Sequence, residues 1–418
     1  MRVPIAFALR TLVGPWIAVP AAVLEVANFF QRGLPWRGEG LWTVDWFAIA
    51  LFIIGPVCAG AAAVDASRLS RPGNIHLVLA TPRPTLPYLR AAAWCAGPVV
   101  AVHLLAIVTG MIVGGVRQPS TGWGWLAAAA LIQCAAIIWY VALGSAIGRF
   151  APPAVAGIAA AGTGFATIYL LGEGGGHDRF ELLALGGATV SRLGYVYNGG
   201  YLVAQLGVLV VTAASFLLIP LRHRSGFAVP TAAGSLLTAA ALGVIAVAPF
   251  LLPASRLEAS PAPPLRCSGT SPEVCLYSEH ERFATSVNGK IKILVRAAVK
   301  GGYPELVPKR VEEISRTYRV TAPETAGIEV ADDTYVSGRM SLEEVVTELV
   351  RPLHCSELYT GEPPTDAYWE REMSLYATWL RLAGVKLDLN DFPVPVRILT
   401  PEQVAEIKSD YARCDLAG

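Results

Sequence analysis

The sequence DASRLSRPGNIHLVLATPRPTLPYLR, residues 65–90, is the longest polar interruption in the apolar N-terminal part of the chain. It contains four arginines and one acid, namely Arg68, Arg71, Arg83, Arg90 and Asp65. Arginine clustered between two apolar segments is typical of the cytoplasmic side of a membrane protein. Residues 74–80, capped by Asn74, are long enough for two helical turns, and Thr81-Pro82 ends them because proline disfavours helix in the preceding residue. The pattern predicts a short cytoplasmic helix that docks a partner.

The composition divides the 418 residues into two unlike parts. A hydrophobic fraction of 54% and a mean hydropathy of +0.48 are too high for a soluble chain, so we predict a polytopic membrane protein. Residues 1–253 hold 14 Arg, no Lys and 7 acids, a net charge of +7. Residues 254–418 hold 19 basic and 25 acidic residues, a net charge of −6. Neither part has the basic patch that nucleic-acid binding requires.

Seven segments are apolar over the roughly 20 residues that a helical bilayer span needs. They are residues 11–30, 45–64, 91–115, 123–148, 152–172, 198–221 and 228–253. With the N-terminus inside, nine arginines fall on the cytoplasmic side and five outside. The arginine bias of cytoplasmic loops favours this orientation. Seven spans from an inside start place the residues after 253 outside the cell.

The C-terminal part is predicted to be a separate extracytoplasmic domain. Residues 254–266 form a Pro- and Ala-rich linker, and residues 267–418 are long enough to bury a core of their own. Two helix starts, two further helical patterns and one strand-like stretch indicate an α+β, mostly helical domain. These are Ser341, Thr400, residues 281–300, residues 368–382 and residues 317–336.

The seven cysteines are also divided between the predicted spans and the predicted outer domain. Three of them lie in predicted spans, where cysteine behaves as a small apolar residue: Cys58, Cys95 and Cys134. The outer domain holds an even number, as a disulfide-bearing domain has. The short spacing favours Cys267–Cys275, which leaves Cys355–Cys414 as the second pair. The alternative is four unpaired thiols in a cytoplasmic tail.

Two ionisable residues lie inside predicted spans and are candidates for a function: Glu25 in the first and His103 in the third. The alternative for Glu25 is that it reaches interfacial water, and the alternative for His103 is a neutral ring bonded to a neighbouring helix. Asp65 and Arg68, three residues apart, are predicted to form a local ion pair.

The long connection between the fifth and sixth predicted spans, residues 173–197, has two interpretations. Residues 180–185 are apolar but too few to cross a bilayer, which favours an interfacial or re-entrant segment. Tyr195 and Tyr197 then lie at the depth of the lipid headgroups. A flexible loop is the alternative.

Motifs of enzymes are missing from the sequence. There is no GxxxxGK[ST] phosphate loop, no HExxH metal motif and no GxSxG nucleophile motif. We therefore expect no catalytic residue, no bound metal and no cofactor in this chain.

The order of long and short loops resembles that of the permease subunit of type-2 ABC transporters. In that family the connector between the second and third spans contains a coupling helix and a Leu-rich sequence of the type LLATP. The stretch Leu77-Val78-Leu79-Ala80-Thr81-Pro82 is similar to it. The resemblance covers approximately residues 1–225. The seventh span and the outer domain depart from it and look like permeases of actinobacterial type.

The resemblance implies an exporter-like permease of the bacterial cytoplasmic membrane that moves an unknown substrate with ATP hydrolysed on a separate ATPase subunit. A second permease subunit, identical or not, would complete the path. The ATPase would dock on the cytoplasmic helix and its flanks: Arg68, Arg71, Asn74, His76, Leu79, Thr81 and Pro82. The rival hypothesis is a membrane-anchored extracytoplasmic receptor, sensor or scaffold without transport activity.

Overall fold

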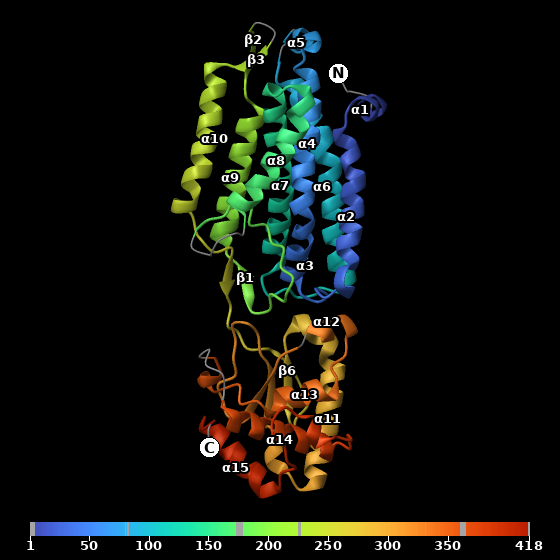
Figure 1. The fold of residues 1–418 in the computed structure, drawn as a ribbon, viewed down its shortest axis with the longest axis vertical. Coiled ribbons are helices and arrows are strands. Elements are labelled where there is room, and N and C mark those ends of the chain that lie inside the picture. The colour runs from blue at the N-terminus through green and yellow to red at the C-terminus, as the bar shows by residue number, and fades with distance from the viewer. Residues whose placement is uncertain are drawn as a thin grey trace.

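A computed structural model describes residues 5–79, 81, 83–172, 179–224, 227–330, 332–359 and 365–416. Figure 1 shows an elongated molecule with two parts: a bundle of long helices, and a smaller region of helices and short strands at one end of it. The chain leaves the last helix of the bundle at this end and remains there to its C-terminus.

The bundle is built from long helices joined by short ones. In chain order its helical segments are α1 (Ile5–Thr11), η1 (Gly14–Ile17), α2 (Ala18–Phe30), η2 (Gln31–Gly33), α3 (Gly40–Phe47), η3 (Ala48–Ala50), α4 (Leu51–Leu69), α5 (Pro72–Leu79), α6 (Leu86–Gly114), α7 (Trp123–Phe150), α8 (Pro153–Leu171), α9 (Gly199–Leu217) and α10 (Ala232–Leu251). Among the described residues, six helical stretches are long and apolar enough to cross a membrane: α3 to α4 as one stretch, α6, α7, α8, α9 and α10. This is the architecture of a polytopic helical membrane protein, as predicted.

The first predicted span, residues 11–30, does not form one long helix. It begins with the 3-10 turn η1, and α2 has only 13 residues. Pro15 lies at the start of η1, and Pro20 lies in the first turn of α2, where its missing N–H prevents a continuous α-helical ladder. Figure 1 shows α2 running along the bundle beside α6. A seventh crossing through η1 and α2 therefore stays a prediction.

Glycine allows α4 and α7 to approach each other closely. A Cβ atom on Gly144 would lie 2.0 Å from the carbonyl oxygen of Ala59, and one on Gly148 would lie 2.2 Å from that of Ala63. Small residues four apart give membrane helices this kind of backbone contact, which replaces the hydrophobic driving force that lipid does not supply. The α4–α7 contact is the centre of the bundle, with α8 and α9 packed around it.

The two ends of the bundle carry different structures. At one end lie α1, α5 and the antiparallel pair β2 (Leu221–Arg224) and β3 (Phe227–Pro230). At the other end β1 (Tyr195–Tyr197) pairs with β4 (Leu257–Ala259), and the C-terminal region begins. The segment that the sequence assigns to the cytoplasm and the region that it assigns to the outside therefore lie at opposite ends of the molecule.

The C-terminal region, residues 257–416, combines a small sheet with helices. Its four-stranded sheet has the order β5 (Arg266–Ser268), β6 (Glu273–Leu276), β7 (Arg310–Glu313) and β8 (Thr325–Ile328), with β5 and β6 antiparallel and the other pairs parallel. Its helices are η4 (Ser278–Phe283), α11 (Ala284–Gly301), η5 (Pro304–Leu306), α12 (Asp332–Ser337), α13 (Leu342–Val350), η6 (Ser356–Tyr359), α14 (Asp366–Leu382), η7 (Leu389–Asp391) and α15 (Pro401–Ala412). The capping boxes predicted at Ser341 and Thr400 are formed. The strand-like stretch 317–336 contains only β8, and its last residues belong to α12.

The cysteines pair as the sequence favours. Disulfides join Cys267 to Cys275, across β5 and β6, and Cys355 to Cys414, which ties the end of the chain to the segment before η6. The three cysteines of the bundle are free and buried: Cys58, Cys95 and Cys134. Cysteines are therefore oxidised only in the region at one end of the bundle.

Candidate functional site

Glu25 and His103, which the sequence places in different predicted spans, meet inside the bundle. Glu25 on α2 is 2% exposed, and His103 on α6 is completely buried. The Nδ1 atom of His103 lies 2.6 Å from Oε1 of Glu25. Glu25 therefore does not reach interfacial water. Instead it forms a buried polar pair with His103, and His103 also bonds to a third helix.

That third helix contributes Gln133, a residue that the sequence analysis did not single out. Its Oε1 atom lies 2.9 Å from Nε2 of His103, and its Nε2 atom donates to the carbonyl oxygens of Val44 and Leu185 at 3.0 and 3.1 Å. Gln133 lies ten residues after Trp123, the first residue of α7, so it is roughly 15 Å from the end of the helix. That is about half the thickness of a bilayer core, so the polar group lies near the middle of the bundle.

The non-helical residues 179–194 enter the bundle and are held by glutamines. Most of residues 180–185 are buried. Gln205 on α9 donates to the carbonyl oxygens of Leu182 and Ala184 at 2.9 and 3.1 Å, and Gln133 donates to the next carbonyl, that of Leu185. Irregular backbone at membrane depth is tolerated only where protein groups satisfy it. This segment therefore has the packing of the predicted re-entrant segment, and we refer to residues 179–194 by that name.

Two oxygen atoms beside the Glu25–His103 pair have no hydrogen-bond partner among the described residues. They are Oε2 of Glu25 and Oδ1 of Asn28, both buried. Asn28 follows Glu25 by three residues, so the two side chains lie on one face of α2. The amide nitrogen of Asn28 donates to the carbonyl of Trp46, whose indole in turn donates to the carbonyl of Asn28. This exchange fixes α2 against α3 and leaves the two oxygens as open acceptors.

A second buried charge cluster lies where the bundle meets the segment after α10. Arg256 binds both carboxylate oxygens of Asp45 on α3, at 3.0 and 2.5 Å. The hydroxyl of Tyr197 donates to the same carboxylate at 2.9 Å. Asp45 is completely buried and Arg256 is 7% exposed. Because a buried ion pair is costly to break, this contact fixes the exit of the chain from the bundle.

His280 joins the C-terminal region to the bundle through two carboxylates. Its Nε2 atom lies 3.0 Å from Oε1 of Glu39, in the loop before α3, and its Nδ1 atom bonds to Glu313 on β7. All three side chains are almost completely buried. Glu39 also accepts hydrogen bonds from the Ser191 hydroxyl and from the backbone N–H of Arg192, so the end of the re-entrant segment meets this cluster too.

The charges of this cluster shift two pKa values in the C-terminal region. Burial alone lowers the pKa of His280, but Glu313 and Glu39 outweigh it and raise that pKa to about 10. Burial and the nearby charge of Glu39 raise the pKa of Glu279 to about 7. At neutral pH His280 is therefore a cation between two carboxylates, whereas Glu279 is close to half protonated.

The end that carries α5 presents the residues predicted to contact a partner. Arg71 and Asn74 are exposed, Arg68 is exposed in the last turn of α4, and Thr81 follows the helix. His76 and Leu79 belong to α5, but the structure does not describe their side chains. Pro82 lies outside the described residues.

Two details at this end differ from the sequence prediction. The helix begins at Pro72 rather than after Asn74, because proline suits the first helical position. The Asn74 amide instead donates to the carbonyl of Arg68 at 2.9 Å. The ion pair of Asp65 and Arg68 is long, at 3.8 Å, and Asp65 mainly accepts the backbone N–H groups of Val13 and Gly14 at 2.9 and 2.8 Å.

The base of α5 is connected to several long helices. Val78 of α5 packs in one buried cluster with Ala66 of α4 and Tyr88 of α6. The guanidinium of Arg149, at the end of α7, lies 4.4 Å from the centroid of the Tyr88 ring and donates to the carbonyls of Leu217 and Ile219 at the end of α9. A displacement of α5 would therefore reach α4, α6, α7 and α9.

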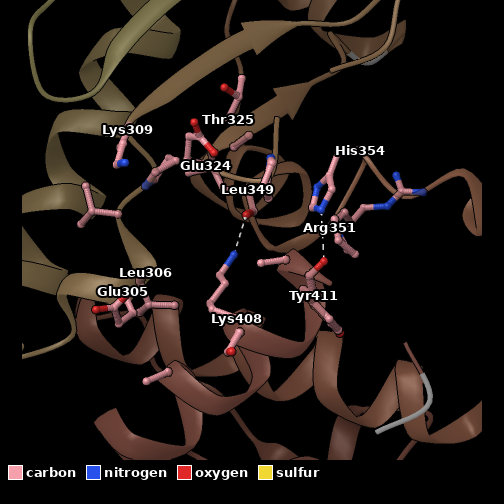
Figure 2. Close-up of a pocket in the computed structure, with 18 residues that line it drawn as sticks. Glu305, Leu306, Lys309, Glu324, Thr325, Leu349, Arg351, His354, Lys408 and Tyr411 are labelled. Atoms are coloured by element: carbon pink, nitrogen blue, oxygen red, sulfur yellow. Dashed lines mark hydrogen bonds between the residues drawn. The ribbon is translucent and has the colours of Figure 1, made fainter. Parts of the chain in front are cut away.

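The C-terminal region contains a polar pocket of about 370 Å³, between α15, η5, the end of α13 and the start of β8. Figure 2 shows Lys408 rising from α15 toward Leu349, whose carbonyl oxygen it approaches to 3.4 Å. The cationic lining residues are Lys309, Arg351 and Lys408, the acidic ones are Glu305 and Glu324, and His354 lines the same pocket. Burial lowers the pKa of Lys408 to about 8.

No family model, no curated protein and no solved structure matches this chain. A functional assignment therefore depends on the geometry of the chain itself, together with the resemblance of its loop order and connector sequence.

Proposed function

We propose that this chain is the membrane permease subunit of an ABC-type transporter, in which a separate ATPase drives movement of a substrate across the bacterial cytoplasmic membrane. The observation that carries the proposal is the placement of α5. It projects from the end of the bundle opposite the C-terminal region, and Val78 packs it against α4 and α6. Arg71, just before the helix, and Asn74, within it, are exposed.

This arrangement suits a helix that transmits force. A partner that moves α5 would move Val78, and with it the cluster of Ala66 and Tyr88. Through the Tyr88–Arg149 contact the movement would reach the end of α9. In this proposal the end with α5 faces the cytoplasm, the disulfide-bonded region faces outward, and a second permease subunit completes the substrate path.

The test is purification of the tagged full-length protein in mild detergent, with mass spectrometry and an ATP-hydrolysis assay. We expect co-purification of an ATPase that carries a GxxxxGK[ST] phosphate loop. The double substitution Arg71→Asp and Asn74→Asp should abolish its binding, whereas Arg117→Asp, an exposed arginine at the opposite end, should leave it unchanged. No ATPase with the wild-type protein, or equal binding to all variants, would contradict the proposal.

The pocket of the C-terminal region favours one second candidate, a receptor for a small anionic ligand. Three cations line it against two acids, and the Nζ atom of Lys408 points into it (Figure 2). The test is calorimetric titration of the full-length protein with inorganic phosphate and with succinate, compared with the Lys408→Met variant. Binding that Lys408→Met removes would support a receptor, and no heat with either anion would count against it.

A further inference from the structure

The orientation of Gln133 determines the protonation of His103. The Gln133 side-chain nitrogen faces two backbone carbonyls, those of Val44 and Leu185, which only accept hydrogen bonds. The amide NH₂ group must therefore point at them, and the amide oxygen must face Nε2 of His103. Because that oxygen only accepts, Nε2 of His103 carries a proton.

The other side of the ring then fixes a second proton. Nδ1 of His103 and Oε1 of Glu25 are 2.6 Å apart, a distance that requires one proton between them. Whether this proton resides on the nitrogen or on the oxygen, the pair is neutral with it. Without it, the carboxylate of Glu25 would face the lone pair of Nδ1, and the pair would carry one negative charge.

The other charged and titratable groups on the surrounding elements are engaged elsewhere or lie far along the helices. Asp45 on α3 is bound by Arg256, and Arg192 of the re-entrant segment lies 3.9 Å from the same carboxylate. Arg90 of α6 and Arg149 of α7 lie toward the α5 end, and Cys134 follows Gln133. In the described parts of these elements, His103 is therefore the only basic side chain within ion-pair distance of Glu25.

We infer that Glu25 and His103 form a binding site for one exchangeable proton, and that its occupancy controls the re-entrant segment. If the proton leaves, Nδ1 and the carboxylate repel each other, and α2 separates from α6 at this point. Oε2 of Glu25 and Oδ1 of Asn28, both buried and without a donor, are the atoms to which entering water would bind.

The connection to the re-entrant segment runs through Gln133. This side chain holds His103 with its oxygen and the carbonyl of Leu185 with its nitrogen, so a shift of His103 loosens the contact to Leu185. Two residues later, the N–H of Gly187 donates to the carbonyl of Asp45 at 2.7 Å. The inference goes beyond the proposed permease function, because an ATPase-driven permease does not require a proton site.

The first test is ¹⁵N NMR of histidine-labelled, full-length protein in nanodiscs, with His103 identified by its loss in His103→Gln. We expect Nε2 to carry a proton and Nδ1 to show a shared proton, because Nε2 faces the side-chain oxygen of Gln133 and Nδ1 faces the carboxyl group of Glu25. Titration of both nitrogens as in an exposed histidine, near pH 6.5, would overturn the inference. This measurement is made on the wild-type protein, so its result does not depend on whether a Glu25 variant folds.

The second test is hydrogen exchange of residues 182–187 as a function of pH, corrected for the intrinsic pH dependence of exchange and referenced to α14. The wild-type segment should lose protection as the pH rises through the value at which the NMR shows loss of the shared proton. Glu25→Gln, whose amide cannot lose this proton, should show no such loss. An equal response in both proteins, or none in the wild type, would contradict the coupling.

Discussion

Replacing His280 by glutamine should release the C-terminal region from the bundle. The substitution removes a cation that is completely buried between Glu39 and Glu313 and leaves the two carboxylates without it. A pKa of about 10, against about 6.5 for an ordinary histidine, corresponds to roughly 5 kcal/mol in favour of the charged ring in the folded protein. Removal of one partner of a buried ion pair costs about 3–5 kcal/mol, a similar value.

The assay is the rate of proteolytic cleavage between residues 254 and 266 in the full-length protein, because β4 and the buried Arg256 protect this segment only while the region is docked. A loss of about 3 kcal/mol or more should raise the cleavage rate at least about 100-fold. The matched control is His354→Gln, since His354 in the same region bonds only a backbone carbonyl. The double variant His280→Gln and Glu313→Gln should recover part of the loss, because it removes one uncompensated charge.

The dependence on pH gives an independent check of the same reasoning. The pKa of His280 is raised in the folded protein, so its contribution is complete below about pH 6.5 and is lost as the pH rises through about 10. Cleavage of the wild-type linker should increase over this range, and cleavage of the His280→Gln protein should not follow it. Equal cleavage of His280→Gln and His354→Gln would refute the account of this contact.

Three further predictions concern the C-terminal region and the bundle. Burial and Glu39 raise the pKa of Glu279 to about 7, so the contact between the C-terminal region and the bundle weakens as the pH rises from about 4.5 to about 7. Glu279→Gln should stabilise this contact at pH 8 by up to about 3 kcal/mol, measured by thermal unfolding. Gly144→Leu should prevent the α4–α7 contact and yield aggregated protein in size-exclusion chromatography, whereas Gly162→Leu, with open space around it, should elute as the wild type does. Replacing Cys355 and Cys414 by serine opens a loop with a sequence separation of 59 and should cost about 4 kcal/mol, measured by thermal unfolding of the region with and without reductant.

Much of the bundle could be predicted from the sequence, because a helix that crosses a bilayer needs a continuous run of about 20 apolar residues, and such runs are visible in the sequence. The six long helices coincide with predicted spans, and the short helix of the polar connector is present. The first span was harder to predict, since hydropathy does not register the interruption by Pro15 and Pro20. The start of α5 differs from the prediction for a related reason: Pro72 suits the first helical position, so the helix begins there and not at Asn74.

The polar centre of the bundle could be predicted only in part. Glu25 and His103 attract attention because charge is rare inside a span, but their pairing across 78 residues depends on how α2 packs against α6. Gln133 and Gln205 could not be recognised in the sequence, because a single glutamine hardly changes the mean hydropathy of an apolar span. Their role is to satisfy the carbonyls of the re-entrant segment, which becomes visible only when that segment is seen inside the bundle.

The most direct test of the proposed function is site-specific photo-crosslinking from position 71, beside α5, and from position 117, at the opposite end, in intact cells. The permease account predicts that the probe at position 71 forms a covalent product with an ATPase that contains a phosphate-binding loop. It also predicts that the probe at position 117 forms no such product. No ATPase product from position 71, or the same product from both positions, would contradict the claim that α5 is the docking site of a driving ATPase.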